Sequence, residues 1–250
     1  MSTGSGNHAG KVALVTGANK GIGFETSRQL GRMGVTVVVA ARDQEKAAQA
    51  AARLQAEGIE TVPLKLDVTS SADVRAAAEF IGRKYGRLDI LINNAGINTE
   101  NFASNDAPTV SQETLRKTFD TNFFAVVELT QAMLPLLQES PAGRVVNLSS
   151  ILASLTLHAD PKSPIAGSKV LAYDASKTAL NAFTIHLADA LKNTKIKVNS
   201  AHPGWVKTDM GGKGATMEIV DGAKTSVHLA LLGEDGPSGA YLHLGKPLPW

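Results

Sequence analysis

The feature that most constrains this chain is a regular alternation of short apolar runs with longer helical patterns. The runs KVALVTG (11–17) and VTVVVAA (35–41) are apolar at almost every position, which is typical of strands buried on both faces. Helical segments such as QEKAAQAAARLQAEG (44–58) separate them. Because strand–helix–strand crossovers join parallel strands, the pattern predicts a doubly wound α/β sheet with helices on both faces.

Seven parallel strands are expected, at residues 11–17, 35–41, 61–68, 88–96, 143–150, 195–204 and 239–244. The expected helices are 24–34, 44–58, 70–86, 111–140, 173–193 and 218–232. Pro63 favours the start or an edge position for its strand, and Pro135 should kink the long helix. Residues 1–10, rich in Gly, Ser and polar residues, predict a flexible tail before a single Rossmann-like domain at 11–250.

Charge and cysteine content narrow the function classes. The 25 basic and 23 acidic residues leave a net charge of +2 without a cationic block, which argues against nucleic acid or an anionic membrane as partner. The absence of Cys excludes disulfides and thiolate metal sites and agrees with a reducing compartment. No apolar run approaches the roughly 20 residues of a membrane span, and the start lacks a signal-peptide core, so a cytoplasmic protein is predicted.

A glycine-rich segment, TGANKGIGFE (16–25), follows the first expected strand and opens the first helix. Gly17, Gly21 and Gly23 would let the backbone turn sharply and approach a pyrophosphate closely. The helix N-terminus would add free N–H groups and a positive dipole end. A ligand-free turn is the alternative, but the strand–glycines–helix order favours a nucleotide site. The spacing is G-x-x-x-G-x-G, not the commoner G-x-G-x-x-G.

The end of the second strand indicates which dinucleotide binds. An acid there would bind the ribose hydroxyl of NADH, whereas a base favours the 2′-phosphate of NADPH. Here Ala41 and Arg42 occupy that position, and Lys20 lies in the glycine segment, so NADPH is predicted over NADH. Asp43 is the contrary observation, since it could pair with Arg42 or cap the next helix.

The third and fourth strands end in LDV (66–68) and NNAG (93–96), at the edge where such sheets bind ligands. Asp67 could accept a hydrogen bond from the adenine amino group, or cap the helix at about residue 70. Asn93 and Asn94 either line the cofactor cleft or serve only as turn residues.

A second group of residues favours proton transfer. Ser149 and Ser150 end the fifth strand, Tyr173 and Lys177 lie one turn apart on the next helix, and Asn122 is a polar residue inside the long helix. A carbonyl that accepts a hydride needs a proton, which a phenol can donate. The ammonium should lower the phenol's pKa from near 10, and a hydroxyl such as Ser150 could hold the carbonyl oxygen. The alternative is an amphipathic helix with a solvated Lys.

Taken in order, the motifs resemble the short-chain dehydrogenase/reductase family: TGxxxGxG (16–23), DV (67–68), NNAG (93–96), Asn122, the Ser-ended strand, YxxxK (173–177) and PG (203–204). The resemblance implies NADPH-dependent, reversible reduction of a ketone or aldehyde. It implies Asn122, Ser150, Tyr173 and Lys177 as catalytic residues, with Lys177 also on the nicotinamide ribose. It further implies cofactor contacts from Gly17, Asn19, Lys20, Gly21, Ile22, Gly23, Arg42, Asp67, Val68, Asn94, Ala95, Gly96, Tyr173, Lys177, Pro203, Gly204, Val206 and Thr208.

Two departures from the family's commonest pattern point to one of its branches. Ser150 and Tyr173 are 23 positions apart (173 − 150), with extra residues within LTLHADPKSPIAGSKV (155–170). The ending GAYLHLGKPLPW (239–250) is also short. Both features are similar to the carbonyl-reductase and menthone-reductase-like branch. That resemblance implies an insert over the helix face used for oligomers, so a monomer is slightly favoured.

Other interpretations remain open from sequence. A catalytically silent nucleotide-binding regulatory protein would not need all four catalytic residues, and a sugar-nucleotide epimerase would need more chain after the sixth strand. Trp205, near the segment GGKGAT (211–216), belongs either to the core or to a substrate lid, together with Met210 and Met217. The same choice applies to Phe102, Leu152 and Leu155. The histidines 158, 186, 202 and 228 have no metal-ligand spacing and are interpreted as structural or exposed. The expected partner is a small, hydrophobic carbonyl compound.

Overall fold

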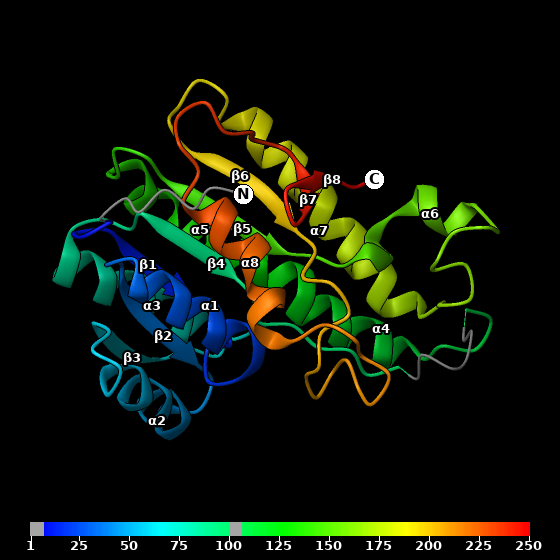
Figure 1. Cartoon of the computed structure of the whole chain (residues 1–250), viewed down its shortest axis with the longest axis horizontal. Helices are drawn as coiled ribbons and strands as arrows, with labels where there is room; N and C mark the ends of the chain where they lie inside the picture. The colour runs from blue at the N-terminus through cyan, green and yellow to red at the C-terminus, as the bar shows by residue number, and fades with distance from the viewer. Residues whose placement is uncertain (1–7, 101–106) are drawn as a thin grey trace.

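Eight strands form one sheet in the computed structural model, which describes residues 8–100 and 107–250 (Figure 1). Their order is β3-β2-β1-β4-β5-β6-β7-β8, and every pairing is parallel except that of β7 with β8. The strands are β1 (Val12–Val15), β2 (Thr36–Ala41), β3 (Thr61–Lys65), β4 (Ile90–Asn93), β5 (Arg144–Leu148), β6 (Lys197–Ala201), β7 (Tyr241–His243) and β8 (Lys246–Pro247).

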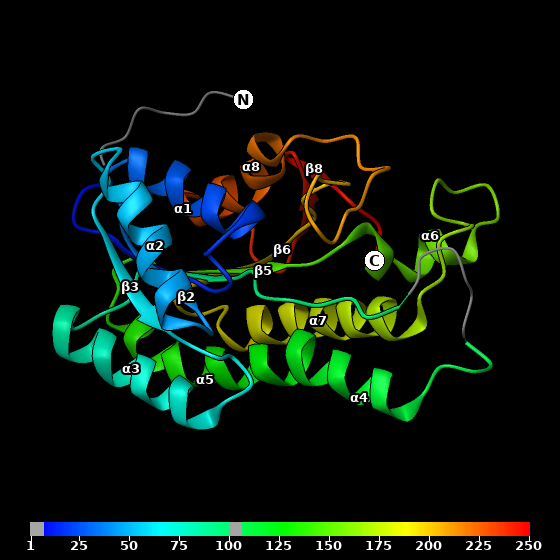
Figure 2. The same ribbon diagram turned by 90° about the horizontal axis from the view of Figure 1, so that it is seen from below.

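Helices cover both faces of this sheet, as Figure 2 shows from below. On one face lie α1 (Gly21–Arg32), α2 (Gln44–Gln55) and α8 (Ile219–Ala230). On the other lie α3 (Ser71–Tyr85), α4 (Gln112–Phe119), a π-helical turn η1 (Asp120–Phe124), α5 (Ala125–Gln138) and α7 (Leu171–Ala190). A 3₁₀ turn, η2 (Ile151–Ala153), and the short α6 (Leu155–Ala159) lie between β5 and α7.

The two layers of helices enclose two hydrophobic clusters. Ala13 and Val15 of β1 pack in the cluster under α1, α2 and α8, whereas Val12 and Leu14 pack in the cluster under α3 and α5. This alternation arises because successive side chains of a strand point to opposite faces. Full burial of one Val or Leu side chain stabilises a fold by about 1.5–3 kcal/mol, so both faces contribute to stability.

Most of the predicted elements are confirmed, and the differences have local causes. Pro63 does lie on an edge strand, β3. The long helix predicted at 111–140 is instead divided by the π-helical turn, and α5 runs through Pro135 to Gln138. Seven parallel strands are present as expected, but β8 was not predicted. It is two residues long and follows a turn in which Leu244 and Gly245 have positive φ.

The remaining expectations concern the chain's start and the membrane. Residues 1–7 of the predicted tail, like Phe102, lie outside the described residues. His8 already donates its backbone N–H to the Met33 carbonyl (3.0 Å), so the proposed domain boundary at residue 11 stays a prediction. Within the described part of the chain, no helix is both long and apolar enough to span a membrane.

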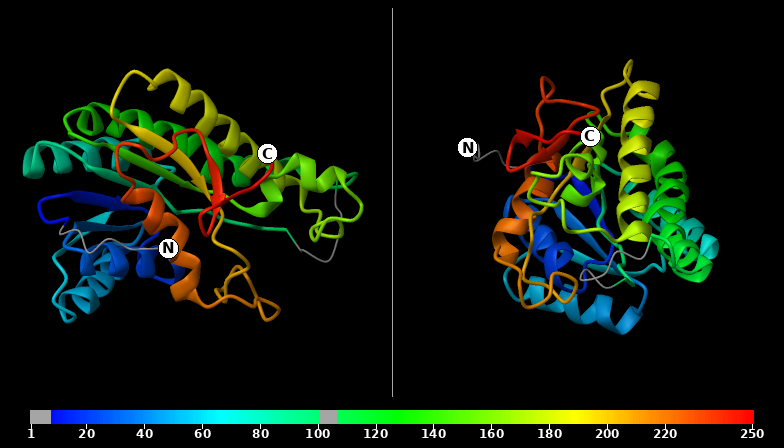
Figure 3. Two further views of the ribbon diagram at one scale, coloured as in Figure 1. Left: turned by 45° about the horizontal axis from the view of Figure 1, so that its top comes forward. Right: turned by 90° about the vertical axis from the view of Figure 1, so that its right-hand side faces the viewer.

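The strand order reverses between β1 and β4, because the chain winds outward from β1 in one direction and from β4 in the other. The carboxyl ends of parallel strands meet at one edge, and such a reversal opens a crevice there. The left panel of Figure 3 shows β1, β4 and β5 side by side at the centre of the molecule. The glycine segment, the NNAG segment and the serine strand therefore end at the same place.

Candidate active site

The glycine segment forms a tight turn between β1 and α1. Gly17 and Gly21 have positive φ (62° and 56°), which favours glycine. A Cβ on Gly23 would lie 2.6 Å from the Gly17 carbonyl oxygen and closer still to the amide nitrogen of Asn94, so no larger residue fits. Lys20 at the N-cap makes no capping bond, and the first turn of α1 has no acid. These backbone N–H groups and the positive dipole end suit an anion.

The NNAG segment is attached to this turn by hydrogen bonds. Asn94 donates its Nδ2 to the Thr16 carbonyl (2.7 Å) and the Gly17 carbonyl (3.3 Å). In return, the Thr16 hydroxyl accepts the backbone N–H groups of Asn94 and Ala95, each at 3.0 Å. The two predicted halves of the cofactor cleft are therefore one rigid unit, which Asn94 holds together.

Two other polar residues of this region have structural partners. Asn93 is the last residue of β4 and donates to Asn147 Oδ1 of the neighbouring strand (2.8 Å), so its interpretation as a turn residue is wrong. Asp67 accepts from the N–H (3.0 Å) and hydroxyl (2.7 Å) of Thr69. The N-cap of α3 is Ser70, which corrects the alternative that Asp67 caps this helix.

The end of β2 presents a basic side chain. Asp43 accepts the N–H of Lys46 (3.0 Å) and caps α2, and this bond holds the pKa of its carboxyl below the ordinary value. Arg42 is exposed and forms no ion pair with any described residue. Lys20 pairs with Asp209 of the loop after β6, and both side chains are exposed. Of the two predicted cations, Arg42 therefore lies at the end of β2, whereas Lys20 is paired with an acid of the loop after β6.

Tyr173, Lys177 and Ser150 meet in a buried group at the carboxyl end of β5. The side chains of Ser150 and Tyr173 share a hydrogen bond. Lys177 donates its Nζ to the Leu148 carbonyl (2.8 Å) and lies 5.8 Å from the centre of the Tyr173 ring. The exposed fractions of these three residues are 8%, 4% and 9%, so water has little access to them.

Burial dominates the pKa values of this group. Desolvation is the main cause that raises the pKa of Tyr173 to about 12. The hydrogen bond from Ser150 lowers this pKa by less, and the charge of Asp174 raises it slightly further. Desolvation also lowers the pKa of Lys177 to about 8. The expected lowering of the phenol's pKa by Lys177 is not found, because burial dominates the shift and Lys177, itself desolvated, is not among its causes. The phenol of this group keeps its proton at neutral pH.

Asn122 reaches the group through the π-helical turn, which sequence periodicity did not predict. Its Oδ1 accepts from the N–H of Ile97 (2.9 Å), and its Nδ2 donates to the Ile97 carbonyl (2.8 Å) and to Ser176 Oγ (3.0 Å). A Cβ on Gly96 would lie 3.3 Å from both Asn122 Oδ1 and Lys177 Nζ. Such π-helical turns occur frequently at functional sites, since they redirect a side chain.

The loop after β6 closes one side of the cleft. Val206 makes a parallel bridge with Met217, so the loop folds back on itself. Thr208 lies against the glycine turn, since a Cβ on Gly21 would lie 3.5 Å from its methyl group. Trp205 is 57% exposed, so its assignment to the core is wrong. Met210 is also exposed, whereas Leu152, in the turn after β5, is buried.

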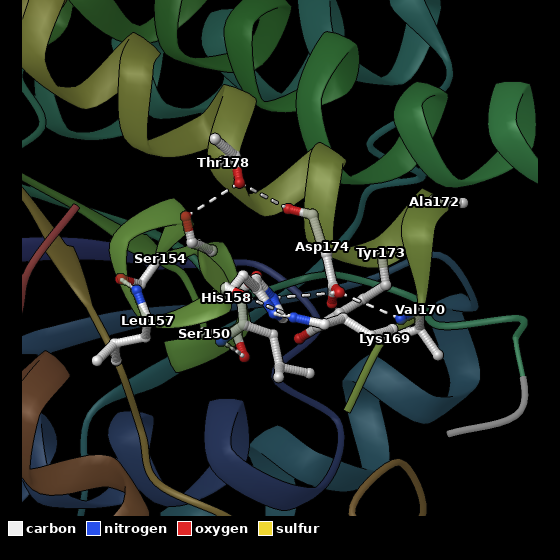
Figure 4. A network of polar contacts seen from close by, with 12 residues as sticks. Ser150, Ser154, Leu157, His158, Lys169, Val170, Ala172, Tyr173, Asp174 and Thr178 are labelled. Carbon is white, nitrogen blue, oxygen red and sulfur yellow. Dashed lines mark hydrogen bonds and ion pairs between the residues drawn. The ribbon is translucent and has the colours of Figure 1, made fainter. Parts of the chain in front are cut away.

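The insert after Ser150 carries a polar network, drawn in Figure 4. His158 Nε2 lies 3.2 Å from Asp174 Oδ2, and its Nδ1 lies 3.0 Å from Lys169 Nζ. His202 is buried, and desolvation lowers its pKa to about 3; its Nδ1 accepts the N–H of Ile151 (3.1 Å). Both histidines thus have partners within the protein, and no cluster of potential metal ligands occurs among residues 8–100 and 107–250.

Two residues at the site carried no signal in the sequence. Tyr241 on β7 is buried and donates its hydroxyl to the main-chain carbonyl of Ser150, and its ring stacks on Trp250 at 5.3 Å. Glu100, in the segment after β4, accepts the N–H of Tyr173 (2.8 Å). No local sequence pattern could indicate either contact, because the partners are 91 and 73 positions apart in the chain.

An apolar hollow of about 560 Å³ lies on the other side of α7, between that helix and α6. Leu155, Val170, Ala175 and Ala182 are among the residues that line it. None of the group around Tyr173 contributes to its wall, so this hollow is separate from the predicted reaction site.

Known proteins resemble the chain over nearly its whole length. The model of the short chain dehydrogenase family matches residues 11–218. Carbonyl reductase (NADPH) 1 of Mus musculus is 36% identical, covering 96% of this chain and 98% of its own. The (+)-neomenthol dehydrogenase of Capsicum annuum is 31% identical, covering 93% and 95%.

Solved structures agree with this. The NADPH-bound carbonyl reductase from chicken fatty liver has a TM-score of 0.84 at 30% identity, covering 97% of this chain and 99% of its own. Salutaridine reductase from Papaver somniferum has a TM-score of 0.80 at 30% identity, covering 92% and 99%. With the glycine turn, the NNAG segment and the Tyr–Lys helix in place at one sheet edge, the chain belongs to the short chain dehydrogenase family.

Proposed function

We propose that this protein reduces a ketone or an aldehyde to an alcohol with NADPH, in a reversible reaction. The observation that carries the proposal is the buried group of Tyr173, Ser150 and Lys177 beside a glycine turn that accepts no Cβ at Gly23. The relatives named carbonyl reductase (NADPH) and neomenthol dehydrogenase support the same reaction class. A silent regulatory protein would gain nothing from burying a phenol and an amine together, at a cost in desolvation.

The residues present fit a dinucleotide. The turn at Gly17–Gly23 and the first turn of α1 would hold the pyrophosphate, where the backbone can approach closely. Arg42 at the end of β2 would pair with the 2′-phosphate, which is the reason to prefer NADPH to NADH. Lys177 would bind the nicotinamide ribose. When bound, the nicotinamide supplies the hydride for the carbonyl carbon.

The chain's own residues would supply the proton. Ser150 would hold the carbonyl oxygen by a hydrogen bond, and Tyr173 would donate its phenolic proton to that oxygen as negative charge develops there. A pKa of about 12 keeps this proton on the phenol in the resting site. Lys177, protonated below its pKa of about 8, would stabilise the resulting phenolate. Asn122 would hold a water through which Lys177 regains a proton from solvent.

The substrate and the assembly state are further parts of the proposal. The exposed Trp205 and Met210 on the loop after β6 favour a hydrophobic carbonyl compound. A monomer is proposed because the insert residues Leu155 and Lys169 lie beside the outer face of α7, at Ala175 and Ala182. Light scattering on a sizing column tests the assembly state, and a dimer mass would contradict this part. A cytoplasmic location stays a prediction.

The test of the reaction is an NADPH-oxidation screen over a panel of ketones and aldehydes, repeated with NADH. We expect turnover of at least one hydrophobic carbonyl, with NADPH preferred and the alcohol formed in equal amount to the NADP⁺. Tyr173→Phe serves as the matched inactive control, because it removes only the phenolic oxygen. NADPH binding without turnover across the whole panel would sink the proposal and favour a regulatory role.

A further inference from the structure

The N-terminus of α7, where Tyr173 lies, is held by a carboxylate from a distant segment. Val170 at the N-cap position makes no side-chain capping bond. Instead, Glu100 accepts the N–H of Ala172 (3.1 Å) and the N–H of Tyr173 itself (2.8 Å). One anionic side chain thus satisfies two N–H groups that the helix leaves unpaired, and its charge complements the positive dipole end.

The segment that carries Glu100 is itself fixed in place. Asn98 accepts the N–H of Glu100 through Oδ1 (3.0 Å) and donates its Nδ2 to the Glu100 carbonyl (3.3 Å). Asn122 binds both backbone groups of Ile97, one residue before Asn98. Glu100 is therefore held at a defined position relative to Asn122.

The backbone carbonyl of Tyr173 is also held, through Ser176, by Asn122. Ser176 donates its hydroxyl to the Tyr173 carbonyl (2.7 Å), and Asn122 donates its Nδ2 to Ser176 Oγ (3.0 Å). The contacts close a ring that runs from Glu100 to Tyr173, Ser176, Asn122 and then back through residues 97–98 to Glu100. Asn122 and Ser176 are both fully buried. The ring fixes the N–H and the carbonyl of the residue whose side chain faces Ser150.

We propose that Glu100 is a positioning residue for Tyr173: its carboxylate, by binding the first turn of α7, sets the phenol's placement against Ser150. The inference rests on the proposed reductase function, since it concerns the proton donor of that reaction. Hydrogen bonds to a carboxylate are shorter and stronger than neutral ones, so two of them restrain the start of the helix effectively. Misplacement of a reacting group by about 1 Å can cost about 100-fold in rate.

The test compares Glu100→Gln, Glu100→Ala and Glu100→Asp with the matched control Glu113→Gln. Glu113 is exposed in the first turn of α4, and no hydrogen bond or ion pair joins it to the described residues of the ring. The amide of Gln turns an N–H donor towards one of the two helix N–H groups. We therefore expect kcat to fall roughly 10- to 100-fold in Glu100→Gln, with an unchanged Kd for NADPH. The isotope effect with NADPH deuterated at the transferred position should rise, because chemistry becomes slower than product release. Glu100→Asp, which keeps both oxygens, should recover part of the rate.

Hydrogen exchange of the first turn of α7 provides a readout that does not depend on activity. The peptide containing Ala172 and Tyr173 should exchange faster in Glu100→Gln than in the wild type, while the peptide containing α1 should not change. A kcat in Glu100→Gln within twofold of the wild type would overturn the proposal. So would a loss of kcat that only follows a loss of folded protein or of NADPH affinity. A wild type without turnover on any carbonyl would instead refute the reductase function, whatever the exchange data show.

Discussion

The N-terminal ends of α1 and α7 both have backbone N–H groups without a capping side chain from the N-cap residue, but the two ends differ in what lies next to those groups. Neither helix has a capping side chain at its N-cap residue, Lys20 or Val170. The first turn of α1 carries no acid, and its neighbours are glycines. The first turn of α7 is instead bound by Glu100, while the carboxylate of Asp174 accepts the N–H of Val170 (3.1 Å).

The difference shows that a helix N-terminus can serve two purposes in the same fold. A helix end that the protein does not neutralise suits the phosphates of a cofactor. A helix end that the protein neutralises itself becomes a rigid support for a side chain, here Tyr173. The cofactor end therefore depends on the lack of side chains, and the reacting end depends on side chains brought from distant segments.

The largest expected effect comes from a substitution at the start of α7 that leaves the start of α1 unchanged. Tyr173→Phe removes the proton donor and should lower kcat by roughly 10²- to 10⁴-fold, because general acid catalysis contributes about that much. NADPH affinity, which we assign to the start of α1, should persist when measured by cofactor fluorescence. Near-normal NADPH oxidation by this variant with a good ketone would contradict the role of Tyr173.

The next largest effect comes from a substitution at the start of α1 that leaves the start of α7 unchanged. Gly23→Ala places a methyl group against the Gly17 carbonyl and the Asn94 amide, so the Kd for NADPH should rise and stability should fall by about 1–3 kcal/mol. Fluorescence titration and thermal unfolding measure the two changes. Gly167→Ala is the control, since a Cβ there would meet nothing within 4 Å. Equal Kd values for the two variants would show that the close approach at Gly23 is not needed.

A smaller effect sharpens the assignment of the α1 end to NADPH. Arg42→Asp should shift the ratio of kcat/KM for NADPH over NADH by roughly 10- to 100-fold towards NADH, from the ~1.5–3 kcal/mol of a hydrogen bond to a charged group. Steady-state rates with both cofactors give this ratio. Asp43→Asn, at the cap of α2, is a neighbouring control. If the ratio stays the same, Arg42 does not contact the 2′-phosphate.

The smallest expected effect concerns Asp174, in the first turn of α7. Burial, and then the charge of Glu100, raise the pKa of Asp174 from 3.8 to about 7. A raised carboxyl pKa stabilises the fold fully below pH 3.8, and this contribution is lost as pH rises through 7. Asp174→Asn should therefore gain stability relative to the wild type between pH 4 and 7.5.

Thermal unfolding across that pH range measures the difference between Asp174→Asn and the wild type. Asp189→Asn, exposed on the same helix, should show no such trend. A constant difference between Asp174→Asn and the wild type at all pH values would mean that Asp174 stays ionised in the folded protein.

Much of this site was predictable because its signals are local. The glycines at 17–23 and the four-residue spacing of Tyr173 and Lys177 follow from rules about one turn or one helix face. Both predictions agree with the positions seen in the structure. The position of Asn122 was predictable only in part, since a π-helical turn is not visible as a change in hydrophobic period.

Other properties depend on contacts that no local pattern records. The sign of the Tyr173 pKa shift was expected to follow its charged neighbour Lys177, but it follows burial, which the packing of β5, β7 and the insert produces. The sequence left Trp205 either in the core or on a substrate lid, and only the fold of the loop after β6 shows that its side chain is exposed.

By itself, then, the sequence determined the α/β class with helices on both faces of the sheet, the glycine turn before α1 and the Tyr–Lys pair at the start of α7, because hydrophobic period and glycine spacing act over a few residues. Only the tertiary structure decided that Glu100 binds the start of α7, that Asp67 is not a helix cap and that burial holds the proton on Tyr173. These depend on desolvation and on hydrogen bonds between segments far apart in the chain, which exist only once the sheet has brought those segments together.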